Sequence, residues 1–171
     1  MQPAMASGAH DRGVDPFERL STEARSALAR AQDEAARRRV GYLGTEHLLL
    51  GLLGVDGCLA ARALADLGVD LPGIRAGMDA APARRQVVAP VGGRIPTTRL
   101  RRVFQLAFGE ALRTGIDVVT TGTLLVGLVL EEDGLASHLL RERGAGAGPV
   151  RDALERLSTG GAFETAVRPP A

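Results

Sequence analysis

Apolar residues recur at helical spacing through most of the chain, with polar or glycine-rich segments between them. The clearest example is the stretch 44–53, GTEHLLLGLL, whose leucines fall on one face of a helix and are expected to be buried. Thr45 can accept a hydrogen bond from a first-turn N–H group, and Glu46 places negative charge on the positive end of the helix dipole. The pattern therefore predicts a short buried helix with an ionisable group at its beginning.

The same pattern occurs a second time as the string TGTLLVGL at 121–128, at an offset of 76 residues, from Thr45 to Thr121. Applied to the whole chain without gaps, this offset aligns many identical residues. They include the pairs Thr22/Thr98, Arg25/Arg101, Ala31/Ala107, Glu34/Glu110, Arg37/Arg113, Gly51/Gly127, Leu64/Leu140, Gly68/Gly144 and Arg75/Arg151. A gapless register of this kind indicates an internal duplication.

Each copy contains four segments of helical periodicity that are bounded by capping residues or glycine. The expected helices are 21–38, 44–54, 58–67 and 70–80 in the first copy, and 97–114, 121–130, 134–143 and 149–157 in the second. We therefore divide the chain into repeat 1 (17–80), a proline-rich linker (81–96) and repeat 2 (97–157). The extensions 1–16 and 158–171 lack periodicity and are expected to be disordered.

The amino-acid composition also favours helices. Aromatic residues make up 3% of the chain and tryptophan is absent, whereas alanine and leucine are abundant. Strands favour β-branched and aromatic residues, so the predicted fold class is all-α, with eight helices in two pseudo-symmetric repeats. A repeat of roughly 75 residues is marginally stable alone, and the two are therefore expected to share one core.

Charge and cysteine content exclude several classes of protein. The net charge is +1, which gives no reason to expect polyanion binding. All 21 cationic side chains are arginine, and an ATPase of the Walker A type requires a lysine. Cys58 is the only cysteine, which favours a reducing compartment. The apolar runs are too short to span a bilayer, and the first sixteen residues lack the apolar middle of a signal peptide, so a cytoplasmic protein is expected.

The spacing of ionisable residues predicts no catalyst, cofactor or metal. His10, His47, His138 and Cys58 lack the short spacings of a metal site, and no order of serine, histidine and acid can be argued. His47 is more simply interpreted as a packing or hydrogen-bonding residue. Glu46, taken alone, is interpreted as an acid that stabilises its helix by roughly 0.3–1 kcal/mol.

The long capped helix, the string YLGTEHLLLGLL and the segment DGCLAARALADLGVDLPGIR together resemble the N-terminal domain of the Clp family of AAA+ unfoldases, nearest to the ClpC type. The resemblance covers residues 17–157. It implies an eight-helix domain that does no chemistry and docks substrates and adaptor proteins for the ATPase ring. Since the sequence contains no nucleotide-binding motif, the chain resembles standalone Clp N-domain proteins. Its expected partners are a Clp ATPase, adaptors or client polypeptides, and its expected role is to modulate proteolysis.

The resemblance also implies a pocket for phosphoarginine in each repeat. In ClpC-type domains a glutamate of the GTEH string holds the guanidinium, and a hydroxyl and N–H groups at helix starts receive the phosphate. Carried over by position, the first pocket contains Ser21, Thr45 and Glu46. The second contains Thr97, Thr121 and Gly122, and it lacks the carboxylate. At most one phosphoarginine site is therefore expected, in repeat 1.

Two functions of other classes remain alternatives. One is a helical nucleic-acid-binding regulator, which would bind DNA in a salt-dependent way. The other is an unrecognised enzyme, which would need more converging titratable groups than Glu46 and His47. The arginines at 84, 85, 99, 101 and 102 form the best candidate surface for an acidic partner, although a solvated face is the simpler interpretation.

Overall fold

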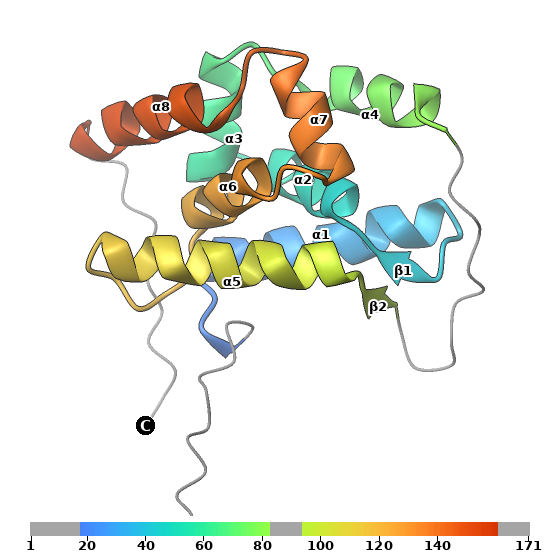
Figure 1. Cartoon of the computed structure of the whole chain (residues 1–171), viewed down its shortest axis with the longest axis horizontal. Helices are drawn as coiled ribbons and strands as arrows, with labels where there is room; N and C mark the ends of the chain where they lie inside the picture. Colours follow the sequence, from blue (N-terminus) through green and yellow to red (C-terminus); the bar gives the residue numbers. More distant parts are fainter. Residues whose placement is uncertain (1–17, 83–93, 161–171) are drawn as a thin grey trace, which may run out of the picture.

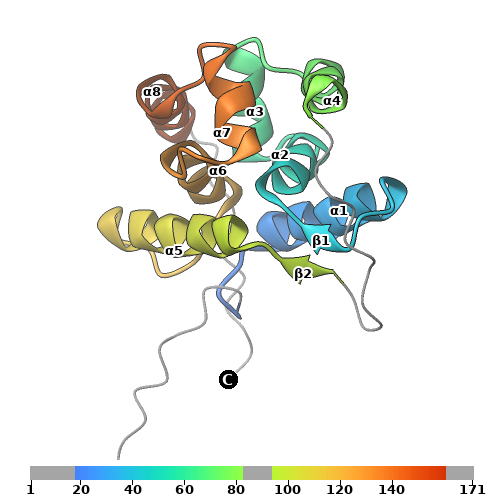
Figure 2. The same ribbon diagram turned by 45° about the vertical axis from the view of Figure 1, so that its right-hand side comes forward.

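The structure is a computed structural model of the chain that describes residues 18–82 and 94–160. These ranges contain eight helices, which confirm the all-α fold and the two four-helix repeats. α1 and α5 form one layer, α2 and α6 form the middle layer, and the other four helices cover them (Figures 1 and 2). The helices are α1 (Thr22–Arg37), α2 (Thr45–Leu53), α3 (Leu59–Asp66), α4 (Leu71–Ala80), α5 (Thr98–Arg113), α6 (Thr121–Leu130), α7 (Leu135–Arg141) and α8 (Ala147–Thr159).

The bounds of α6 are those that the sequence predicts, 121–130, and its N-cap is Thr120, whose hydroxyl accepts the Thr123 N–H group. The start of the last helix differs from the predicted 149. α8 begins at Ala147, so that Pro149 lies inside its first turn. Proline is tolerated there because the first N–H groups of a helix have no intrahelical acceptor.

Most of the segments predicted to be extensions or linker lie outside the described residues. These are the whole extension 1–16, residues 83–93 of the linker and residues 161–171 of the tail. Two parts of these segments are ordered elements instead. Ser158 and Thr159 belong to α8, and Ile95–Pro96 form a strand.

The prediction missed a pair of two-residue parallel strands. β1 (Tyr42–Leu43) pairs with β2 (Ile95–Pro96), and Leu20 forms an isolated parallel bridge with Val119. The two pairings are equivalent: when residue numbers are shifted by the offset of 76, the contact between β1 and β2 coincides with the Leu20–Val119 bridge. The two repeats exchange roles between the pairings. Two residues are too few to show the alternation by which a strand is predicted, so only the fold reveals this exchange.

The aligned glycines of the two repeats lie where two helices touch through their backbones. A Cβ atom at Gly51 of α2 would lie 2.1 Å from the Ala27 carbonyl oxygen of α1. At Gly127 of α6 it would lie 2.5 Å from the Val103 carbonyl oxygen of α5. Each repeat is therefore built on a helix pair that only glycine permits to approach so closely.

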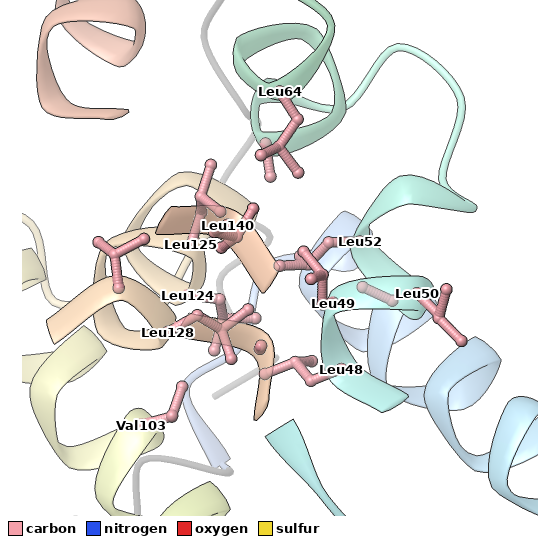
Figure 3. Close-up of a cluster of buried hydrophobic side chains, with 14 of the residues drawn as sticks. Leu48, Leu49, Leu50, Leu52, Leu64, Val103, Leu124, Leu125, Leu128 and Leu140 are labelled. Carbon is pink, nitrogen blue, oxygen red and sulfur yellow. The ribbon is translucent and has the colours of Figure 1, made fainter. Parts of the chain in front are cut away.

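The hydrophobic core is centred on α2 and α6. Leucines from the two helices face each other within the middle layer, Leu140 of α7 lies beside Leu125, and Leu64 of α3 covers the cluster from above (Figure 3). All of these side chains are fully buried. Because both repeats contribute to this one cluster, the halves share a core as the sequence predicts.

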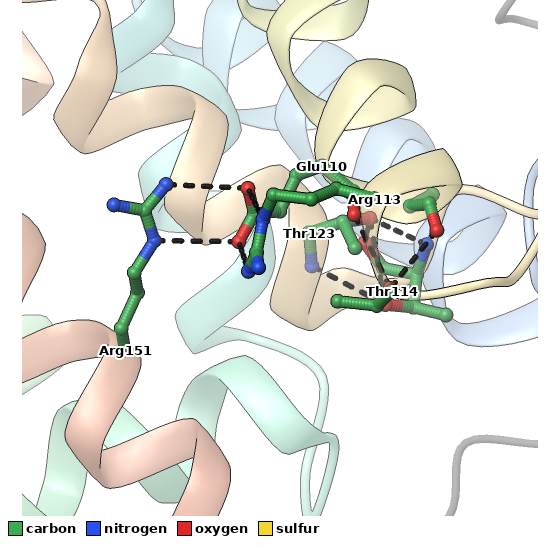
Figure 4. Close-up of polar contacts among 7 residues, drawn as sticks. Glu110, Arg113, Thr114, Thr123 and Arg151 are labelled. Carbon is green, nitrogen blue, oxygen red and sulfur yellow. Dashed lines mark hydrogen bonds and ion pairs between the residues drawn. The ribbon is translucent and has the colours of Figure 1, made fainter.

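A buried carboxylate in each repeat ties the first helix to the fourth. Glu110 of α5 accepts hydrogen bonds from Arg113, at 2.7 Å, and from Arg151 of α8, at 3.2 Å (Figure 4). The hydrogen bonds from Arg113, and then those from Arg151, outweigh burial and lower the pKa of Glu110 to about 2. Repeat 1 has the equivalent set, namely Glu34 with Arg37 and Arg75.

Candidate functional site

The short parallel pairings place the starts of helices from different repeats side by side. The Thr97 N–H group, at the start of α5, donates to the Leu43 carbonyl oxygen just before α2, at 2.9 Å. The Ser21 N–H group, at the start of α1, donates to the Val119 carbonyl oxygen just before α6, also at 2.9 Å. Consequently α2 begins beside α5, as Figure 2 shows from the side of β1 and β2, and α1 begins beside α6.

This arrangement corrects the way in which the sequence grouped the site residues. The sequence assigned Ser21 to a pocket with Thr45 and Glu46, but the structure places Ser21 next to the segment that precedes α6. Thr45 instead lines a pocket with Thr97 of repeat 2. The physical reason is the reciprocal strand pairing. In each repeat, the segment before the first helix pairs with the segment before the second helix of the other repeat.

The pocket at these two helix starts, called here the α2–α5 pocket, is lined by Thr45, Thr97, Thr98 and Arg99 and has a volume of about 400 Å³. The Thr97 hydroxyl caps α5 by accepting the Leu100 N–H group at 3.1 Å. Two helix N-termini and one guanidinium therefore converge on the pocket, which favours an anionic group there.

Glu46 lies beneath this pocket and not in it. The residue is 2% exposed, and its carboxylate folds back over the start of its own helix. A Cβ atom on Gly44, the N-cap residue, would lie 2.4 Å from Oε2 of Glu46. The acid thus occupies the space of the side chain that the glycine cap lacks, in agreement with its interpretation as a helix-start acid.

His47 completes the start of α2 as a neutral hydrogen-bonding residue. Its Nδ1 atom accepts the Gly44 N–H group at 3.0 Å, and its ring lies 5.5 Å from the ring of Tyr42 between centroids. Burial lowers the pKa of His47, against the opposing effect of the Glu46 charge. The unprotonated Nδ1 that the hydrogen bond requires is therefore also the favoured state.

The structure adds a carboxylate that the sequence interpretation missed. Glu131, at the end of α6, is 5% exposed, and its Oε1 atom lies 3.8 Å from Nε of Arg99. Its Oε2 atom is buried and has no hydrogen-bond partner among the described residues. The Cβ position of Gly134 lies 2.6 Å from this oxygen and 2.9 Å from the Thr45 hydroxyl, so Glu131 and Thr45 both approach the same side of Gly134.

One signal in the sequence could have pointed to Glu131. The residues Glu131, Glu132 and Asp133 follow α6 directly, where negative charge opposes the helix dipole. The sequence shows only this unfavourable charge at the helix end; the burial of Glu131 is seen in the structure. The acidic run looked like an ordinary loop because nothing in the sequence places it near Thr45 or Arg99.

Comparison with known proteins identifies the family. Residues 19–143 match the family model described as the Clp repeat (R) N-terminal domain. The chaperone protein ClpC1, chloroplastic, from Oryza sativa subsp. japonica is 33% identical over 153 residues, which are 88% of this chain. The chain belongs to the Clp N-terminal domain family. It spans 16% of the length of that relative.

Solved structures show the same fold for the Clp N-terminal domain at lower identity. The N-terminal domain of the chaperone ClpD from Arabidopsis thaliana has a TM-score of 0.68 and 23% identity, covering 86% of this chain and 99% of that one. The complex of the ClpV N-domain with a VipB peptide also has a TM-score of 0.68, with 16% identity, covering 96% of this chain and 99% of that one.

The second predicted site of this Clp N-terminal domain keeps the threonine contact of the first and differs in the residue that follows. The Thr121 hydroxyl accepts the Ala60 N–H group at the start of α3, at 3.2 Å, and the Thr45 hydroxyl likewise accepts the Ala136 N–H group of α7, at 3.4 Å, and not a first-turn N–H group of α2 as expected. A Cβ atom on Gly122, which takes the place of Glu46, would lie 2.9 Å from Cδ2 of Leu59 and 3.3 Å from Cδ2 of Leu154. Thr97, which was assigned to this site, lines the α2–α5 pocket instead. The space of the missing acid is thus filled by apolar side chains.

The remaining candidate features of the domain give no further site. Within residues 18–82 and 94–160, no three His, Cys, Asp or Glu side chains are grouped so that they could hold a metal ion. No described helix combines the length and the apolarity that crossing a membrane requires. Of the arginine cluster, residues 84 and 85 lie outside the described ranges, whereas Arg101 and Arg102 are exposed on α5.

Proposed function

We propose that this chain is a non-catalytic docking module that binds polypeptides and thereby modulates Clp-dependent proteolysis. Membership of the Clp N-terminal domain family supports this proposal, and so does the fold shared with a ClpV N-domain that binds a VipB peptide. The clients, an adaptor or a Clp unfoldase are its proposed partners, in the cytoplasm.

The proposed ligand group is phosphoarginine, and the α2–α5 pocket is its proposed site. The observation that carries this proposal is the convergence of two helix starts, Arg99 and the hydroxyls of Thr97 and Thr98 on one pocket. Backbone N–H groups at helix starts and a guanidinium suit a phosphate, and a nearby carboxylate suits the guanidinium of the ligand. The space equivalent to Glu46 in repeat 2 is filled by leucines, so one site per chain is proposed.

Isothermal titration calorimetry of the whole chain with free phosphoarginine tests the ligand. We expect binding with a stoichiometry of one, which weakens as ionic strength rises because charge interactions contribute. The variant Arg99→Ala should bind at least about tenfold more weakly, since it loses a charge-assisted hydrogen bond. Arg102→Ala, on an exposed part of the same helix, is the matched control and should bind as the wild type does. Absence of binding by the wild type would rule out phosphoarginine as the ligand.

A further inference from the structure

We infer that a second cavity, between α1, α2 and α4, binds a glutamate side chain of a docked polypeptide. This cavity, called here the α1–α4 cavity, has a volume of about 100 Å³, and the arginines that line it are Arg30, Arg37 and Arg75. The inference rests on the proposed docking of polypeptides, because it names a further group that such a polypeptide presents. The cavity shares no lining residue with the α2–α5 pocket.

Arg30 supplies a guanidinium that the described residues do not engage. It is exposed, and it forms no hydrogen bond or ion pair within the described part of the chain. Its side chain lies over the end of α2, where the Cβ position of Gly54 is 3.2 Å from Cδ of Arg30. A guanidinium has five N–H donors and can give two of them to one carboxylate. Arg30 is therefore available to bind an acidic group that enters the cavity.

The other two arginines use only part of their hydrogen-bonding capacity on Glu34. Arg37 donates through Nη1 and Arg75 through Nη2, one hydrogen bond each, and both bonds go to the same oxygen, Oε1. In repeat 2 both arginines of the equivalent set donate through two nitrogens and reach both oxygens of Glu110 (Figure 4). The side chains of Arg37 and Arg75 are 68% and 43% exposed. Donors of both therefore remain for a ligand.

The charge and the shape of the cavity favour a carboxylate on a short apolar stem. Asp33 and Glu34 are the acids among its lining residues, so three cations and two anions leave one positive charge. A carboxylate balances this charge, whereas a phosphate, with up to two negative charges, exceeds it. Leu50 and Leu71 add apolar surface that suits methylene groups. The volume equals that of roughly three water molecules, which is enough for the end of a glutamate side chain.

The equivalent place in repeat 2 separates binding from structural support. At the 76-residue offset, Leu106 replaces Arg30 and Leu130 replaces Gly54, so an apolar pair takes the place of the guanidinium and the glycine beneath it. The ion pairs around the buried acid are present in both repeats and are explained by stability. They do not include Arg30. Arg30 is therefore the residue that makes the α1–α4 cavity a site for an acidic ligand.

An NMR titration of the whole chain tests this site. The ligand is an acetylated and amidated peptide in which one glutamate is the only charged residue. We expect the side-chain Nε–H signal of Arg30 and the amide signal of Gly54 to shift, and the same peptide with glutamine should leave both unchanged. Arg30→Leu, which introduces the residue of repeat 2, should bind the glutamate peptide at least about fivefold more weakly. Arg25→Leu, exposed on the same helix outside the cavity, is the matched control and should bind as the wild type does.

Inorganic phosphate and thermal unfolding test the competing explanations. Tighter binding of phosphate than of the glutamate peptide at these signals would overturn the assignment to glutamate. The Tm of Arg30→Leu should stay within about 2 °C of that of the wild type, because no interaction within the fold is lost. A lower Tm with unchanged peptide binding would show a structural role instead. Should Arg30→Leu fold poorly, the wild type decides the question, and an unchanged Arg30 signal would overturn the inference.

The outcomes distinguish this inference from the proposed ligand of the α2–α5 pocket. If phosphoarginine binds and the glutamate peptide does not, the inference about the α1–α4 cavity is wrong and the proposed ligand stands. If the glutamate peptide binds and phosphoarginine does not, the α1–α4 cavity is confirmed as a site and the proposed ligand falls.

Discussion

The starts of α2 and α6 occupy equivalent positions in the two repeats and solve the same capping problem with different residues. In α2 the cap is Gly44, and the carboxylate of Glu46 fills the space beside it. In α6 the cap is Thr120, whose own hydroxyl accepts the Thr123 N–H group at 3.2 Å, and glycine replaces the glutamate. The glycine and the larger side chain have exchanged places between the repeats.

This exchange shows that a change within a duplicated framework can be compensated locally. A threonine cap supplies an acceptor directly, so the acid two residues later is no longer needed. The space that it leaves is packed by Leu59 and Leu154. The comparison also warns against taking the acid of the GTEH string as evidence of a ligand, because its presence and its absence both have a structural explanation.

The framework that the repeats share should be most sensitive at the glycine contacts. Gly51→Ala should destabilise the protein by about 3 kcal/mol or more, because the new methyl group meets the backbone of α1, which cannot move aside as a side chain could. Gly127→Ala should cost less, since its nearest backbone oxygen is 2.5 Å from the Cβ position rather than 2.1 Å. Urea unfolding followed by circular dichroism measures both losses.

The matched control is Gly109→Ala on the exposed face of α5. Nothing lies within 4 Å of the Cβ position at Gly109, so alanine should stabilise the protein by about 0.5–1 kcal/mol through helix propensity. A similar result for all three variants would mean that the two helix pairs are not in backbone contact.

These glycines illustrate what the sequence could and could not predict. Gly51 and Gly127 align without a gap, and each lies at the backbone contact of a helix pair. Glu34 and Glu110 also align, and each carboxylate accepts hydrogen bonds from two arginines. The helical framework therefore followed from local periodicity and one offset. The pairing of β1 with β2 did not, because it depends on contacts between residues distant in sequence. The misassigned pocket followed from that omission, as did the failure to connect Glu131 with Arg99.

The buried ion pairs should make stability depend on pH in acid. The pKa of Glu110 is about 2, below its ordinary 4.5, so the unfolded chain binds this proton more tightly than the folded chain does. The resulting stabilisation is present above pH 4.5 and is lost as the pH falls from about 4.5 to 2. Because the side chains of Arg113 and Arg151 are 63% and 42% exposed, solvent screening limits it to about 2 kcal/mol.

Urea unfolding of the wild type and of Glu110→Gln across this range checks the expected loss. Glu110→Gln should be less stable at neutral pH and should lack the part of the acid slope that Glu110 contributes. The same measurement on Glu34→Gln compares the two repeats directly. Parallel pH curves for the wild type and Glu110→Gln would contradict the assigned role of Glu110.

A smaller effect is expected from rebuilding the start of α2 with the residues of α6. Gly44→Thr should destabilise the protein by about 1 kcal/mol, since its Cβ atom would lie 2.4 Å from the Glu46 carboxylate and displace it. Glu46→Gly should cost a similar amount through lower helix propensity and loss of charge at the dipole. The double variant removes the collision and restores a threonine cap, so it should cost less than the sum of the single changes by at least about 0.5 kcal/mol. A double-mutant cycle in urea measures this coupling, with Thr45 and His47 left unchanged. If the loss of stability in the double variant equals the sum of the two single losses, Glu46 does not act as the substitute for a missing cap. Its carboxylate would then be available to a ligand.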